Sequence, residues 1–174
     1  MGMLSSNRVC IKLFILILFF YVEVSSAQPT LPQRTLTVAP TQKLDFGLFL
    51  DSNGSGGTIA IDWRGNRTTT GSIIALNSYP GKPALFELKL CQGRNVTITY
   101  DPNTTLTESN GEAITLDIGP TEKGGNGAVF ATENHCNFIT ILRVGGILHI
   151  PQNATTGVYN GQLKIFFEQY TWIY

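Results

Sequence analysis

Gly157-Val158-Tyr159-Asn160-Gly161 leads, through Gln162, into Leu163-Lys164-Ile165-Phe166-Phe167-Glu168-Gln169-Tyr170. A tyrosine at a tight corner before an alternating strand is typical of strand F in an immunoglobulin-like sandwich, where its hydroxyl bonds back to the preceding backbone. We therefore expect Gly157, Tyr159 and Gly161 to form such a corner, with Tyr159 buried. An ordinary sandwich has one more strand after this one, and the sequence ends at Tyr174. Either the corner is misassigned, or the domain is an incomplete sandwich that a strand from elsewhere completes.

The remainder of the sequence after residue 27 is typical of an all-β protein. Short runs of alternating apolar residues recur between Gly, Asn, Asp, Pro and Thr, and helical periodicity is hard to find. Leu44, Phe46, Leu48 and Leu50 are expected to share one face of a strand, and further strands are predicted within 73–75, 86–90, 96–100, 114–118, 138–144 and 148–150. Residues 119–137 are rich in Gly and polar residues, which predicts a loop. We predict a single immunoglobulin-like Greek-key β-sandwich.

The N-terminal residues have the pattern of an export signal. Arg8 and Lys12 precede an apolar run at 13–22, and small residues at 25–27 suit a signal peptidase that cleaves after Ala27. The alternative is a membrane anchor, but the run is short for a bilayer span and is closed by Glu23. We therefore expect a signal peptide at 1–27 and one domain at 28–174.

Cysteine usage agrees with export. Cys10 leaves with the signal peptide, so Cys91 and Cys136 remain as an even pair in an oxidising compartment, and we expect them to form a disulfide. The alternatives are two free thiols or half of a metal site. A four-ligand zinc site would need carboxylates beside His135 and His149, so no metal is expected.

Charge and catalytic residue types point away from several function classes. Lys plus Arg and Asp plus Glu each number 12, and charged residues make up 14% of the chain, so nucleic acid and anionic membranes are not expected partners. Membrane contact is expected only during export. His149 alternates outward beside Leu148 and Ile150, and His135 adjoins Cys136, so we expect no catalytic triad, no enzyme activity and no cofactor.

Three segments in a fixed order carry a resemblance to a known family. They are Leu44-Asp45-Phe46-Gly47, residues 86–100, and Val144-Gly145-Gly146-Ile147-Leu148-His149-Ile150-Pro151 running into 157–161. Together, over roughly residues 35–170, they resemble the bacterial family of exported proteins catalogued as domain of unknown function DUF4402. The resemblance implies an immunoglobulin-like fold, a surface or filament role in the style of chaperone–usher pilins and spore-coat-type subunits, and no catalytic residues. Cys91, Cys136 and the polar stretch at 119–137 depart from the family pattern.

The first functional hypothesis is an exported, non-enzymatic structural subunit of a bacterial surface filament, pilus or coat, assembled by donor-strand complementation. Its partners would be copies of itself or homologous subunits, with a periplasmic chaperone as a further partner, and its route would run from the periplasm to the cell surface. Leu36 and Val38 lie in the candidate exchanged segment, which completes either its own domain or a neighbour's. The alternative is a self-contained secreted binding or adhesin-like module that contacts carbohydrate or protein. A third hypothesis, a secreted hydrolase, is not favoured, because no catalytic triad or metal-ligand set can be assembled from the residues present.

Overall fold

The computed structural model describes residues 35–90, 94–133, 135 and 137–169, and in these residues every helix or strand element is a strand. In chain order the strands are β1 (Thr37–Gln42), β2 (Phe49–Asp51), β3 (Gly57–Ile61), β4 (Arg67–Gly71), β5 (Ile73–Ala75), β6 (Ala84–Lys89), β7 (Asn95–Tyr100), β8 (Asn103–Thr107), β9 (Ala113–Thr121), β10 (Val129–Ala131), β11 (Thr140–Ile150) and β12 (Ile165–Gln169). The described residues contain no helix long and apolar enough to cross a membrane. The predicted all-β class is confirmed.

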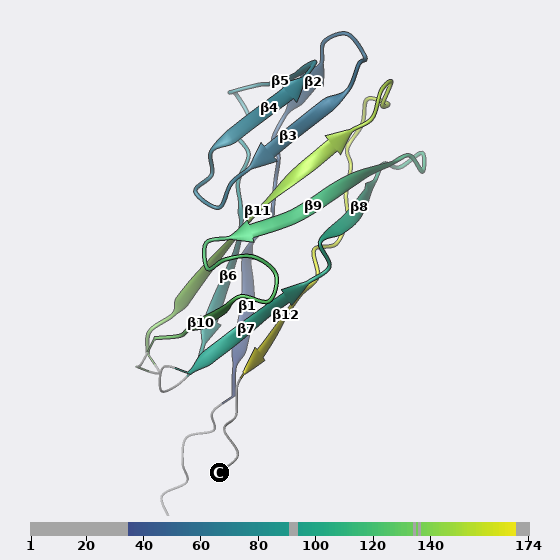
Figure 1. The fold of residues 1–174 in the computed structure, drawn as a ribbon. Helices are drawn as coiled ribbons and strands as arrows, with labels where there is room; N and C mark the ends of the chain where they lie inside the picture. The colour runs from purple at the N-terminus through teal and green to yellow at the C-terminus, as the bar shows by residue number, and fades with distance from the viewer. Residues whose placement is uncertain (1–34, 91–93, 134, 136, 170–174) are drawn as a thin grey trace, which may run out of the picture. The chain divides into compact units, whose positions relative to one another are not determined.

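Two sheets make up the sandwich (Figure 1). In the larger sheet the long strand β11 pairs with β6 on one side and β9 on the other, because Val144 has Ala84 and Thr121 as its two antiparallel partners. β1 pairs with the outer edge of β6, which gives the order β1-β6-β11-β9. The smaller sheet has the order β10-β7-β12. In chain order these strands correspond to A-B-E-D and to C and F of the immunoglobulin fold, so the predicted sandwich topology is observed.

An insertion between β1 and β6 adds four short strands. β3 pairs with the C-terminal half of β11 and with β4, while β2 and β5 form a separate two-stranded sheet. The guanidinium of Arg67 donates to the carbonyl oxygens of Leu76 at 2.7 Å, Tyr79 at 3.0 Å and Phe46 at 3.2 Å. These three bonds tie the two loops of the insertion together.

The predicted strand at residues 44–50 is wrong. Only Phe49–Asp51 is a strand there, Phe46 is buried, and Leu48 and Leu50 are 46% and 41% exposed. The cause is Gly47, whose φ of 71° breaks the extended backbone and whose Cα lies against the Tyr79 carbonyl. The apolar alternation therefore continues across a turn, and the two halves of the run face different surroundings.

The core lies between the two sheets. Ile98 on β7, Leu142 and Val144 on β11, and Leu88 on β6 are all fully buried. The predicted alternation in 96–100 and 114–118 is confirmed, since the even-numbered residues of both segments are buried. Residues 119–137 are not a loop throughout, because β9 extends to Thr121 and β10 pairs with β7, which buries Phe130.

Candidate functional site

The corner before β12 is held by Tyr159. Its hydroxyl donates to the carbonyl oxygen of Thr155 at 2.9 Å, and the two hydroxyls lie 3.2 Å apart. The amide of Thr155 in turn donates to the Glu112 carboxylate, just before β9, at 3.1 and 3.2 Å. The back-bonding tyrosine is therefore present, but Tyr159 is half-buried, which corrects the expectation that it is buried.

Gly157 and Gly161 are needed for close packing and not for a tight backbone turn. Neither has a positive φ, so the backbone does not need glycine for its conformation. A side chain at Gly157 would meet Glu108, and one at Gly161 would meet Leu106 on β8. The two glycines allow the segment before β12 to lie close against β8, where Asn160 forms an isolated bridge with Thr107.

β12 is an edge strand of the smaller sheet (Figure 1). It pairs antiparallel with β7, with Phe167 opposite Ile98. Leu163, Ile165 and Phe167 pack against the core, as predicted. In the part of the chain that the structure describes, no strand pairs with the other side of β12. This is the side on which strand G lies in an immunoglobulin domain.

The segment with Leu36 and Val38 belongs to the chain's own larger sheet. Val38 in β1 pairs with Leu88 in β6, and a register shift occurs between Pro40 and Gln42. Proline is tolerated there because β1 is an edge strand. Of the two positions left open by the sequence, the structure has this segment beside β6 of the same chain, and it does not occupy the free side of β12.

A partly covered apolar surface runs along this edge of the sandwich. The rings of Phe86 on β6 and Phe167 on β12 lie 5.9 Å apart and tilted by 55°, so β12 packs over β6. Further inward-facing residues at this edge are only half-buried, whereas those in the middle of both sheets are fully buried. We call the half-buried set the edge groove: Leu36, Val38, Phe86, Leu163, Ile165 and Phe167.

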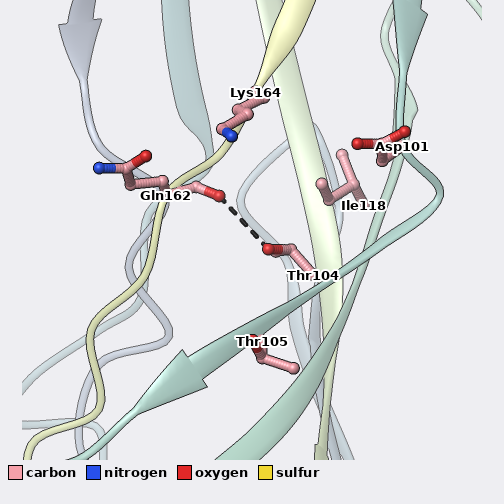
Figure 2. Close-up of a pocket in the computed structure, with 6 residues that line it drawn as sticks. All are labelled: Asp101, Thr104, Thr105, Ile118, Gln162 and Lys164. Carbon is pink, nitrogen blue, oxygen red and sulfur yellow. Dashed lines mark hydrogen bonds between the residues drawn. The ribbon is translucent and has the colours of Figure 1, made fainter.

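A separate concave feature of the surface is polar. A cleft with a volume of about 270 Å³ is lined by Asp101, Thr104, Thr105, Ile118, Gln162 and Lys164 (Figure 2). The Thr104 hydroxyl lies 3.5 Å from the Gln162 carbonyl oxygen. Lys164 and Asp101 stand apart across the cleft, and among the described residues no ion pair joins them. Sequence reasoning did not identify this cleft, because its residues come from three separate segments with no common motif.

Polar side chains elsewhere make local contacts. His149 Nε2 lies 2.7 Å from Asp117 Oδ2, between neighbouring strands on the outer face of the larger sheet. His135 packs edge-on against Phe138.

The carboxyl of Asp51 has a lowered pKa. The Ser72 hydroxyl donates to Asp51 and, with the amides of Gly54 and Gly56, lowers the pKa of that carboxyl despite partial burial. Within the described ranges no three His, Cys, Asp or Glu side chains form a metal-binding group.

Three predicted site residues lie outside the described residues. They are the cleavage position Ala27 and the expected disulfide partners Cys91 and Cys136. The disulfide, the signal peptide and the export route therefore stay predictions.

Comparison with known proteins gives one finding. The model of a family described as "Domain of unknown function (DUF4402)" matches residues 36–168. This range begins one residue before β1 and ends within β12, so it contains the corner, the edge groove and the insertion. No curated protein and no solved structure matches the chain.

Proposed function

The chain belongs to the family described as "Domain of unknown function (DUF4402)", and from this premise we propose that it is an exported, non-enzymatic structural subunit of a bacterial surface filament, pilus or coat. In this proposal the free side of β12 accepts an extended segment of a neighbouring subunit. The observation that carries it is the combination, at one edge, of a strand side that pairs with no other described strand and of apolar side chains that are only half-buried.

The chemistry of the edge groove fits an added strand. Backbone groups on the free side of a strand are ready partners for another chain, and the apolar residues beneath would be covered by alternate side chains of that strand. β12 has five residues, so an accepted segment would span about 17 Å at a rise of about 3.4 Å per residue. It would have apolar residues at every second position over that length.

The accepted segment is best sought outside the acceptor's own first strand. Leu36 and Val38 already cover β6 and the core of their own molecule, so donating them to a neighbour would expose Leu88 and Phe86. A neighbour's segment of alternating apolar residues, from a copy or from a homologous subunit, has no such cost. A periplasmic chaperone that shields the same edge during export fits this scheme.

The test is to express the full chain in a bacterium that exports it and to analyse surface material on gels without heating. We expect ladders of subunits that resist detergent and collapse to a monomer band after heating. Ile165→Thr, which places a hydroxyl in the edge groove, should weaken the ladder. Ile74→Thr on β5, an exposed position outside the groove, is the matched control and should leave it intact. A monomer band alone in every sample would contradict the proposal.

The alternative function is a self-contained binding module that contacts carbohydrate or protein. The polar cleft of Figure 2 favours it, because hydroxyl, carbonyl, ammonium and carboxylate groups belong to the residues that line it. Under this alternative the exported protein forms no ladder of subunits. Substitution of Lys164 or Asp101 would then abolish binding to a polysaccharide or protein ligand and leave the fold unchanged.

A further inference from the structure

The outward face of β12 has an unusual pattern of exposed side chains. Lys164, Phe166 and Glu168 follow one another on this face, and Phe166 is 57% exposed. On β7, Phe166 pairs with Thr99 and Glu168 with Thr97, and both partners are neutral. Lys164 directly precedes β12 and lines the polar cleft together with Asp101. Within the described residues neither Lys164 nor Glu168 forms an ion pair. Residues 164–168 therefore carry a cation, a large apolar ring and an anion, in this order, along an edge with which no other described strand pairs.

This order is complementary to itself when the strand is reversed. We propose that, in the absence of a donor strand, two copies of the chain pair antiparallel through the free sides of β12, about a twofold axis at Phe166. Lys164 then lies opposite the partner's Glu168, and Ile165 lies opposite the partner's Phe167. The two Phe166 rings face each other across the axis.

In this register, favourable contacts form on both faces of the joined strands. On the outer face two Lys–Glu pairs and an aromatic pair form, and such cross-strand pairs contribute favourably. On the inner face Ile165 and Phe167 of the two copies extend the apolar cover of the edge groove. The contact is isologous and closes on itself, and it joins two three-stranded sheets into one continuous sheet.

A simpler explanation is that the charges of Lys164 and Glu168 only prevent other chains from pairing with an exposed edge strand. Charged side chains on edge strands commonly discourage association. On that explanation the signs and positions of the two charges do not matter, and reversing one of them leaves the protein a monomer as before. The dimer requires opposite signs at positions 164 and 168, which makes the two explanations separable.

The dimer concerns the subunit before a strand is accepted, so it does not rest on the proposed function. Both uses need the same side of β12, and the dimer would therefore compete with donor-strand insertion. Ladder formation at the cell surface and dimerisation in solution are separate measurements. Loss of one does not remove the other.

The test is analytical ultracentrifugation of the purified, exported chain over a range of concentrations. We expect a monomer–dimer equilibrium. Lys164→Glu and Glu168→Lys should each raise the dimer dissociation constant at least tenfold, and the double variant Lys164→Glu/Glu168→Lys should restore it to near the parent value. Lys89→Glu, an exposed lysine on β6, is the matched control and should have no effect.

Two results would overturn the inference. One is a parent protein that stays monomeric at every concentration. The other is a dimer whose strength is no better in the double variant than in the single variants. Circular dichroism and melting curves of each variant show that the fold is retained, which is expected because both charged side chains are exposed.

Discussion

Replacing Phe167 by alanine tests whether β12 closes the sandwich over β6. Truncation of a fully buried Phe to Ala costs about 3–5 kcal/mol. Phe167 is half-buried, so its own burial accounts for about 2 kcal/mol of that loss. Its tilted ring pair with Phe86 adds about 0.5–1.5 kcal/mol. We therefore expect Phe167→Ala to lower the free energy of unfolding by about 2.5–3.5 kcal/mol.

The assay is urea unfolding followed by circular dichroism. With a slope of about 2 kcal/mol per M, the midpoint should fall by about 1.3–1.8 M. Phe166→Ala is the matched control on the next residue, where the ring is 57% exposed and the expected cost is below about 0.5 kcal/mol. Both are measured in the Lys164→Glu background, so that association through β12 does not contribute. Equal costs for the two substitutions would refute the assigned facing of β12.

Three further substitutions test separate features of the structure. Tyr159→Phe removes the 2.9 Å bond to the Thr155 carbonyl and should cost about 1 kcal/mol in the same urea assay, whereas an unchanged midpoint would reject a stabilising role for the corner. Gly47→Ala forces a side chain onto a backbone with a φ of 71° beside the Tyr79 carbonyl and should cost about 1–3 kcal/mol or more, with Gly125→Ala, which has nothing within 4 Å, as a neutral control. Asp51→Asn tests pH dependence: the pKa of Asp51 is lowered by Ser72, so its charge stabilises the fold at neutral pH and the benefit is lost as acid protonates the folded carboxyl. The melting temperatures of parent and Asp51→Asn should therefore converge as the pH falls through the lowered pKa of the folded carboxyl, and a constant difference would contradict this.

The parts of the fold that sequence analysis predicted well have one physical feature in common. In β7 and β9 every second residue enters the core, so the period of two is visible in the residue types themselves. The same is true of β12, where the predicted inward residues Ile165 and Phe167 pack against the core. A half-buried strand between turns can therefore be predicted from the alternation of its residue types.

The predictions that were wrong have physical causes that a single sequence does not show. Residues 44–50 keep their apolar alternation across Gly47, and only the φ of that glycine reveals the turn. β10 has one buried residue, Phe130, so no period is present to detect. Tyr159 was expected to be buried because of its neighbours in sequence, but its exposure depends on how closely the corner packs on β8.

The edge groove was indicated only in part. The alternating strand at the C-terminal side suggested a sandwich with an open edge, and the family resemblance agreed. The position of Leu36 and Val38 beside β6 depends on pairing between distant segments, which the sequence left open. The polar cleft and the reversed charge pattern on β12 likewise become meaningful only after the strands are placed.

Amide hydrogen exchange along residues 165–168 tests most directly whether the free side of β12 receives a strand from another molecule. The comparison is between the isolated Lys164→Glu monomer and detergent-resistant surface material that contains the same variant. In a strand, alternate amides point to opposite sides, so about half of these amides face the free side. We expect those amides to exchange rapidly in the monomer and to be strongly protected in the assembled material. Equal exchange of these amides in both samples would contradict the account.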